Sequence, residues 1–182
     1  ACGSSYYSSL LGKYYFEDIL KKEVEVVLAS EAIYHFPLIK NNSLFIFVSQ
    51  SGETLDVLNV IKLCKNKHIP IIGITNSFNS SITHLCKNIL YIYAGSEKAV
   101  ASTKAFLGQS LLFYILCNYN KNLKKDFLAL KKEIKRILLN KKEIESFSLT
   151  LKDYKDVFYL GRNIDYYIAL EGALKLKEIS YI

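Results

Sequence analysis

The chain has 182 residues, of which 51% are hydrophobic and 23% are charged, and its formal net charge is +7. This length is enough for one complete hydrophobic core, or for one domain together with part of another. No apolar run approaches the roughly 18 residues that a membrane helix needs, so we expect a soluble protein without a membrane partner.

Lysine carries almost all of the positive charge, because Arg136 and Arg162 are the only arginines in the sequence. Much of this charge lies in residues 121–142, where lysines alternate with apolar residues as they do on an amphipathic helix. The segment has no arginine fork for reading bases and no recognisable RNA-binding motif. We therefore expect no nucleic-acid partner.

The cysteines predict neither a metal site nor a disulfide framework. The four cysteines are Cys2, Cys64, Cys86 and Cys117. No two of them form a C-x-x-C pair, and no histidine accompanies them at the spacing of a metal site. Reduced thiols in a cytoplasmic protein are the simplest interpretation.

Strand-like and helical patterns alternate along the chain. The patterns predict strands over 24–29, 44–48, 69–75, 89–94 and 157–160, and helices over 5–20, 54–65, 102–118, 124–146 and from 165 onward. Such alternation predicts an α/β fold, a doubly wound three-layer sandwich of flavodoxin-like type whose parallel sheet is flanked by helices. We expect a complete unit over 1–150 and the truncated start of a second over 151–182. Because the sequence lacks methionine and stops within a helical pattern, we expect it to be a piece of a longer polypeptide.

The stretch VSQSGETLDV, residues 48–57, joins a predicted strand to a predicted helix. It carries hydroxyl and amide side chains, namely Ser49, Gln50, Ser51 and Thr54. Gly52 lets the backbone approach a ligand, and the first turn of a helix binds anions through its unpaired N–H groups and its dipole. Phosphate binding and simple N-capping by Ser51 both fit the residues. Since no G-x-G-x-x-G or P-loop pattern is present, a small phosphorylated metabolite fits the turn better than a nucleotide.

Two further hydroxyl-rich turns precede predicted helices. One is ACGSSYYSS at the start of the chain, and the other is VASTKAF around Ser102 and Lys104. Turns at the carboxyl ends of parallel strands can converge on one polyhydroxylated, phosphorylated ligand. Serine is common at helix starts, so each turn alone is a weak indication.

The last segment places three charged residues on one stripe of a helix. Glu171, Lys175 and Glu178 are spaced i, i+4 and i+7. They can be an exposed ion pair, or a base with its electrostatic partner facing a pocket, and the spacing alone favours the ion pair.

Four motifs together resemble the isomerase half of the glutamine–fructose-6-phosphate aminotransferase family, which consists of two sugar-isomerase (SIS) subdomains. They are ACGSS, VSQSGETLDVL, AGSEKAVASTKAF and YLGRNIDYYIALEGALKLKEISYI, and the resemblance runs from residue 1 to residue 182. It implies that the phosphate is held by Ser49, Gln50, Ser51 and Thr54, and that the sugar is lined by Gly3, Ser4, Ser5, Val100 and Ser102. It also implies that Glu178 is the base that moves a proton between C1 and C2, and that Lys175 assists at the sugar oxygens. For Lys175 and Glu178 the resemblance outweighs the ion-pair interpretation. Glu171 is still interpreted as a structural member of an ion pair.

The resemblance further implies the reaction and its partners. A glutaminase domain of the same parent chain supplies ammonia, which adds to fructose 6-phosphate, and isomerisation yields glucosamine 6-phosphate in a cytoplasmic homodimer without metal or redox cofactor. The chain departs from the family at Ser4, where threonine is usual. Cys2 is not the nucleophile of the absent glutaminase domain, and neither the ring-opening histidine nor the C-terminal lysine of the family lies within residues 1–182. We therefore expect this fragment to bind sugar phosphate without turning it over.

Two other functions fit parts of the pattern. A non-catalytic SIS module that senses phosphosugars in a regulator needs the turn at 49–54, but it does not need Lys175 and Glu178. A sugar-phosphate isomerase without amination is disfavoured by the predicted strand and helix after residue 150.

Overall fold

Three of the apolar runs form a parallel sheet in the computed structural model, which describes residues 1–36 and 42–181. The strands are β1 (Phe45–Val48), β2 (Ile71–Thr75) and β3 (Ile89–Tyr91), and they lie in the order β1-β2-β3. Phe47 pairs with Gly73, and Ile74 pairs with Leu90. Parallel neighbours need a crossover connection, which α3 (Leu55–Asn66) and α4 (Ser81–Leu85) supply.

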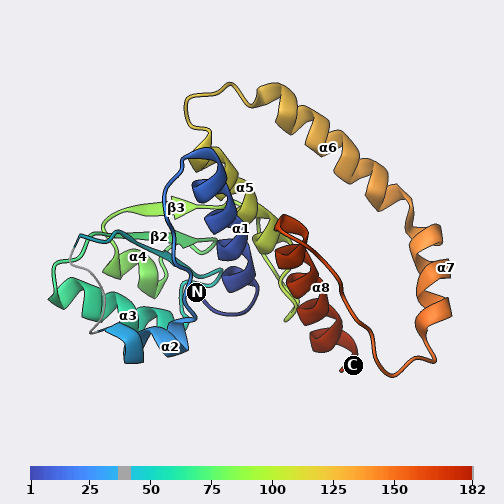
Figure 1. Ribbon diagram of the computed structural model, residues 1–182, viewed down its shortest axis with the longest axis horizontal. Helices are drawn as coiled ribbons and strands as arrows, with labels where there is room; N and C mark the ends of the chain where they lie inside the picture. The colour runs from blue at the N-terminus through green and yellow to red at the C-terminus, as the bar shows by residue number, and fades with distance from the viewer. Residues whose placement is uncertain (37–41, 182) are drawn as a thin grey trace.

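Helices cover both faces of this sheet, so the predicted three-layer α/β sandwich is confirmed (Figure 1). On one face lie α2 (Ala29–His35), α3 and α4, and on the other lie α1 (Gly3–Ile19) and α5 (Lys104–Cys117). The helix α8 (Ile164–Ser180) packs against α1. The two helices between α5 and α8 are α6 (Lys124–Leu139) and α7 (Lys141–Leu151).

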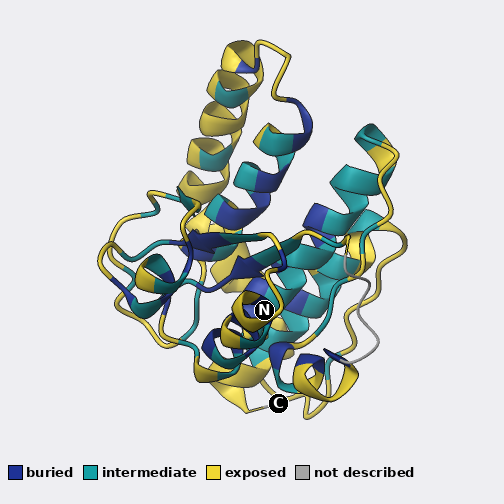
Figure 2. Ribbon diagram, turned by 90° about the vertical axis from the view of Figure 1, so that its left-hand side faces the viewer, coloured by how far each residue is buried: buried dark blue, intermediate teal, exposed yellow. Residues whose placement is uncertain are grey.

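The alternation of side chains along each strand divides the core into two clusters. Phe45 and Phe47 face α2 and α3, whereas Val48 and Ile74 face α1 and α5 together with Phe113. Ile74 is completely buried, and full burial of such a side chain stabilises the fold by about 1.5–3 kcal/mol. Figure 2 shows that burial concentrates in the sheet and in the helix faces packed on it.

Two predicted strands are wrong. Residues 24–28 form no strand, and helix α2 begins at Ala29. The backbone of Val24 bonds to side chains instead of a neighbouring strand: its N–H donates to Glu17 and its carbonyl accepts from Lys13. Residues 157–160 are also without strand pairing within the described ranges, and Phe158 and Leu160 are 85% and 90% exposed. The division into units at residue 150 stays a prediction.

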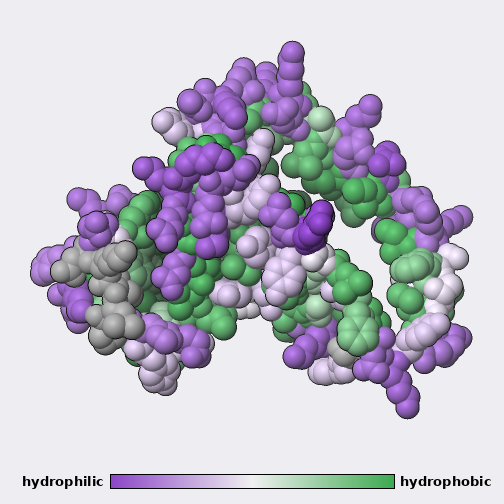
Figure 3. All heavy atoms as spheres, in the orientation of Figure 1, coloured by the Kyte–Doolittle hydropathy of each residue, from purple (hydrophilic) through white to green (hydrophobic). Residues whose placement is uncertain are grey.

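The helix predicted over 124–146 is two helices, α6 and α7, which meet at Asn140 and extend away from the body as an arm (Figure 1). Neither helix buries a residue. Apolar side chains line the side of the arm that faces the rest of the molecule (Figure 3). Within the described ranges, no helix has the length and apolar character required to cross a membrane.

Gly12 on α1 brings that helix into close contact with α5. A Cβ atom at Gly12 would lie 2.8 Å from Cγ of the buried Phe113 ring. We predict that Gly12→Ala lowers the free energy of unfolding by about 1–3 kcal/mol, because overpacking outweighs the better helix propensity of alanine. Urea denaturation of the full-length protein measures the change.

Gly108 on α5 is the matched control for this prediction. A Cβ atom there would meet Ile92 at 3.4 Å, an ordinary contact, so Gly108→Ala should be neutral or stabilising. Equal effects of the two substitutions would contradict the close approach of α1 and α5.

Candidate functional site

The turn between β1 and α3 is closed by the Ser49 hydroxyl. Ser49 is 2% exposed; its Oγ accepts a hydrogen bond from the Gly52 N–H at 3.0 Å and lies 2.9 Å from Thr54 Oγ1. The Ser51 hydroxyl accepts from the Glu53 N–H at 3.1 Å. Thr54, not Ser51, is the N-cap residue of α3, and it makes no side-chain cap bond. The first-turn amides of α3 are therefore left without a side-chain cap, as an anion site at a helix start requires.

Only glycine fits at position 52. Its φ is +71°, and a Cβ atom would lie 2.1 Å from Ser80 Oγ and 2.8 Å from Ile82 Cγ2. The Gly52 carbonyl accepts from the Ile82 N–H at 3.0 Å. The turn therefore rests directly on the start of α4.

Hydrogen bonds join this turn to the next two turns along the sheet edge. The Gln50 carbonyl accepts from the Thr75 hydroxyl at 3.2 Å and from the Asn76 N–H at 3.0 Å. The Asn76 side chain donates to the Gly95 carbonyl at 2.7 Å and accepts from the Ala94 N–H at 2.9 Å. The turns that follow β1, β2 and β3 are thus held in one network.

Glu53 is a structural member of this network that the sequence patterns did not single out. Its carboxylate accepts from the Ser81 hydroxyl at 2.5 Å and from the Ser81 N–H at 2.7 Å. These two hydrogen bonds from Ser81 lower the pKa of Glu53 below its ordinary value. The feature of the sequence that could have pointed to Glu53 is its position inside the SQSGET stretch of this turn.

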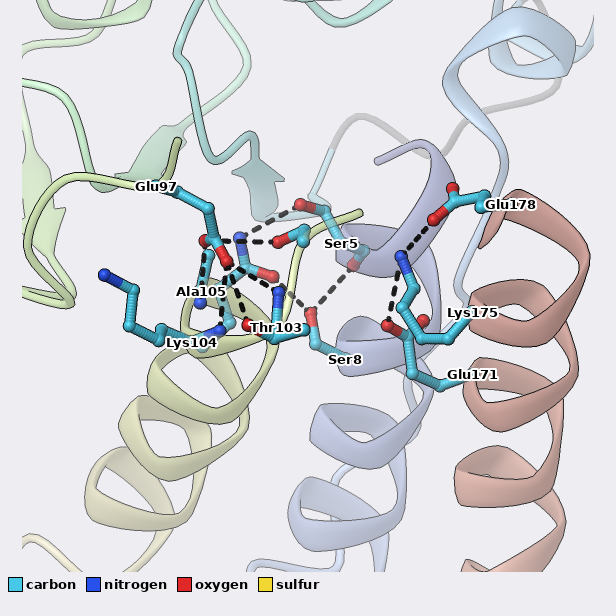
Figure 4. A network of polar contacts seen from close by, with 11 residues as sticks. Ser5, Ser8, Glu97, Thr103, Lys104, Ala105, Glu171, Lys175 and Glu178 are labelled. Carbon is cyan, nitrogen blue, oxygen red and sulfur yellow. Dashed lines mark hydrogen bonds and ion pairs between the residues drawn. The ribbon is translucent and has the colours of Figure 1, made fainter. Parts of the chain in front are cut away.

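At the start of α1, a buried polar clamp joins α1 to α5. The Ser8 hydroxyl donates to Gln109 Oε1 at 2.6 Å, and Gln109 Nε2 donates to Ser5 Oγ at 2.9 Å (Figure 4). Gln109 is 1% exposed, and the predicted site residues Ser4 and Ser5 are also buried. Gly3 begins the helix with a φ of +53°. Two of the serines in this segment, Ser5 and Ser8, therefore hold α1 and α5 together.

The start of α1 lies beside the carboxyl end of β1. Ala1 packs against the core cluster that contains Val48 and Ile74. The Ala1 carbonyl also accepts from the Ala29 N–H at 3.0 Å. The predicted sugar-lining residues at the start of α1 are therefore positioned next to the strand that leads into Ser49.

The third turn is organised by Glu97, another residue that sequence patterns did not identify. Its carboxylate accepts from the N–H groups of Thr103, Lys104 and Ala105 at 2.6, 3.1 and 3.1 Å, so it caps α5 (Figure 4). Burial tends to raise the pKa of Glu97, but these backbone hydrogen bonds outweigh it and lower the pKa below 4.5. The predicted residue Ser102 lies 3.4 Å from the same carboxylate.

Val100, by contrast, is completely exposed. The structure brings the other sugar-lining candidates into the turns at the starts of α1 and α5, but it leaves the side chain of Val100 in solvent.

On α8 the three predicted charges do form one stripe (Figure 4). The Lys175 ammonium lies 2.5 Å from Glu178 Oε2 and 3.7 Å from Glu171 Oε1. Glu171 is 6% exposed, and its carboxylate oxygens have no hydrogen-bond partner among the described residues. Burial raises the pKa of Glu171.

Other hollows and clusters do not compete with this region. A hollow at the α6–α7 junction has a volume of about 670 Å³ and is lined by Arg136, Ile137, Leu139, Asn140, Glu143, Ile144 and Phe147. Its polar side chains already have partners, because Arg136 pairs with Glu133 and Asn140 bonds to Glu143. In the part of the chain that the structure describes, no three His, Cys, Asp or Glu residues are arranged to hold a metal ion.

The Glu97 cap predicts a pH dependence of stability. Because the pKa of Glu97 is lowered on folding, its contribution is complete above its ordinary value of 4.5 and is lost as the pH falls through the lower folded-state pKa. We predict that Glu97→Gln lowers the urea midpoint at pH 7 and weakens the fall of that midpoint between pH 5 and roughly pH 3. Glu145→Gln on the exposed face of α7 is the control. If the urea midpoint of Glu97→Gln equals that of Glu145→Gln at every pH, Glu97 does not cap α5.

Residues 1–119 match the SIS domain family. The chain is 43% identical to the glutamine–fructose-6-phosphate aminotransferase [isomerizing] of Clostridium acetobutylicum, and 41% identical to that of Fusobacterium nucleatum. Each match covers 100% of this chain and 32% of the relative, so the chain spans about one third of the length of these curated relatives.

Two solved structures have the same fold. The C-terminal domain of glucosamine-fructose-6-phosphate aminotransferase from Francisella tularensis has a TM-score of 0.85 and 36% identity, and the match covers 100% of this chain and 54% of that one. A glucosamine-6-phosphate deaminase from Thermotoga maritima has a TM-score of 0.87 and 27% identity, with 99% and 56% covered. These likenesses confirm the resemblance carried by the four motifs, and because the family match covers well over half of the residues, the chain belongs to the SIS domain family.

Proposed function

We propose that this chain is the first SIS subdomain, with the opening of the second, of a glutamine–fructose-6-phosphate aminotransferase. It would bind the sugar phosphate and supply the base for proton transfer between C1 and C2. The observation that carries the proposal is the Lys175–Glu178 pair on α8, at 2.5 Å, in a chain that also presents the Ser49–Thr54 turn. Binding alone would need the turn, whereas the pair is suited to acid–base chemistry.

The turn after β1 would hold the phosphate. Ser49, Gln50, Ser51 and Thr54 offer neutral hydrogen-bond donors around the start of α3. The amides and the dipole of that helix would attract the anion without a lysine or arginine in the turn. The internal bonds of Ser49 would fix the turn before the ligand arrives, which lowers the entropic cost of binding.

The sugar would extend from this turn toward α1, α5 and α8. Gly3, Ser4 and Ser5 on α1 would line it on one side, and Val100 and Ser102 before α5 on another. Ser5 is held in place by Gln109, so its position is set by both helices. The exposed Val100 would reach the sugar only if the 95–101 segment moves when the ligand binds.

In the reaction, ammonia adds at C2 of open-chain fructose 6-phosphate and water leaves, which gives an imine. The hydrogen on C1 is acidified by this C2=N bond, so the Glu178 carboxylate can remove it. Electrons from the C1–H bond form C1=C2 while the C2=N π pair moves to nitrogen, which takes up a proton from solvent. The protonated Glu178 then returns its proton to C2, and the C1 hydroxyl loses its own proton to solvent as it becomes the aldehyde of glucosamine 6-phosphate. The Lys175 ammonium would stabilise negative charge that develops on the sugar oxygens.

The ammonia would come from a glutaminase domain of the same parent chain, and the active protein would be a cytoplasmic homodimer that needs no metal or redox cofactor. The curated relatives are about three times as long as this chain, which leaves room for such a domain and for the remainder of the isomerase half. An isomerase or deaminase without amination would use the same pair of residues. Identity of 43% to an aminotransferase, against 27% to a deaminase structure, favours the aminotransferase.

Steady-state assays test the base in the full-length protein. We predict that Glu178→Gln lowers the rate of glucosamine 6-phosphate formation from fructose 6-phosphate and glutamine by at least about 100-fold, because the amide cannot accept the proton. Lys177→Gln, on an exposed position of the same helix, should keep the wild-type rate. If Glu178→Gln forms glucosamine 6-phosphate at the wild-type rate, Glu178 is not the base.

Calorimetric titration tests the phosphate turn. We predict that Ser49→Ala/Ser51→Ala weakens binding of glucosamine 6-phosphate to the full-length protein by roughly 10- to 100-fold, because hydrogen bonds to a charged group are lost. Ser148→Ala on α7 is the control, and unphosphorylated glucosamine should bind more weakly than its phosphate to all three proteins. Unchanged affinity of the double variant for the phosphate would contradict the proposal.

A further inference from the structure

Glu171 is the buried charged residue, among those that the structure describes, that the proposed mechanism does not use. Its side chain is 7% exposed, and neither of its oxygens accepts a hydrogen bond of ordinary geometry within the described residues, although the Ser4 hydroxyl of α1 faces it. A buried carboxylate without hydrogen bonds is costly unless an opposite charge lies close to it. A glutamate whose only role was a surface ion pair would be expected at an exposed position.

The compensating charge is Lys175, one helical turn further along α8. Its ammonium lies between two carboxylates, 3.7 Å from Glu171 Oε1 and 2.5 Å from Glu178 Oε2 (Figure 4). The exposed side-chain fractions increase from 7% at Glu171 through 17% at Lys175 to 32% at Glu178. The three charges thus form a row from the interior toward the surface, with the proposed base at its outer end.

The neighbours of Glu171 on α1 are polar but uncharged. Ser4 and Tyr7 of that helix face it, while Lys175 and Glu178 lie on its own helix. Burial raises the pKa of Glu171, the Ser4 hydroxyl and Lys175 oppose this increase, and Glu178 adds to it. Lys175 is therefore the cation that the structure sets against Glu171 in the described part of the chain.

We propose that Glu171 is a positioning residue, a fixed buried counter-charge that holds the Lys175 ammonium in the site while the charge of Glu178 changes. The inference rests on the proposed function, in which Glu178 alternates between carboxylate and acid. When Glu178 accepts the C1 proton, its attraction for Lys175 falls, and a partly exposed pair of this kind is weak to begin with. Glu171 takes no part in the proton transfer, so its attraction for Lys175 persists through the cycle.

Steady-state kinetics of the full-length protein test this role. Glu171→Gln keeps the shape of the side chain but removes its charge, so we expect kcat to fall roughly 10- to 100-fold, the scale of a misplaced catalytic group, with KM for fructose 6-phosphate changed less than threefold. Glu171→Asp keeps the charge but moves it away from Lys175, so its kcat should lie between those of the wild type and Glu171→Gln. Circular dichroism checks that each variant is folded.

A double-mutant cycle separates positioning from a merely structural role. In a Lys175→Ala background the further change Glu171→Gln should have no effect on kcat, because the ammonium that Glu171 holds is gone. A full additional loss in that background would overturn the inference. So would a wild-type kcat for folded Glu171→Gln, or a Glu171→Asp variant that equals either the wild type or Glu171→Gln.

The single variants Lys175→Ala and Glu178→Gln distinguish failure of this inference from failure of the proposed function. If both keep the wild-type rate, the proposed function itself is wrong, and the role of Glu171 falls with it. If both lose activity while folded Glu171→Gln does not, only the positioning role is refuted.

Discussion

The candidate site depends on how α1 is held between α5 and α8. Gly12 lets α1 approach the Phe113 ring, and the Gln109 clamp fixes Ser5 and Ser8 against α5. On its other side α1 packs against α8, where it covers Glu171. Because Ala1 also packs beside the end of β1, one helix sets the distance of the serine-rich turn at its own start from both the turn after β1 and the charged stripe on α8. A polar clamp between buried side chains suits this task, since hydrogen bonds fix geometry more narrowly than apolar contacts do.

Three carboxylates fix the positions of backbone and side-chain groups around the turns and on α8. Glu53 holds the start of α4, Glu97 caps α5 and Glu171 faces Lys175. Although the chain as a whole carries a net charge of +7, the turn after β1 that is proposed to bind phosphate contains no lysine or arginine. Attraction for the ligand would come from the backbone dipoles of α3, while the excess lysines lie largely on the exposed arm of α6 and α7.

Local patterns predicted what depends on local chemistry. The apolar runs at 44–48 and 69–75 contain β1 and β2, the polar turn after β1 was identified from its hydroxyls, and the stripe of Glu171, Lys175 and Glu178 follows from helical spacing. The strands predicted over 24–29 and 157–160 are wrong because a strand also needs a neighbouring strand, which a local pattern cannot reveal. The Gln109 clamp joins residues more than 100 positions apart, and the burial of Glu171 results from coverage by α1, so neither was visible in the sequence.

The central claim is that Glu178 moves a proton between C1 and C2 of a sugar phosphate held by the turn after β1. The most direct measurement is NMR of fructose 6-phosphate deuterated at C1, incubated with the full-length protein. The account predicts that the wild-type protein removes deuterium from C1, to C2 or to solvent, and that Glu178→Gln leaves the label in place. Loss of the label at the wild-type rate in Glu178→Gln would contradict the account, because another group would then be the base.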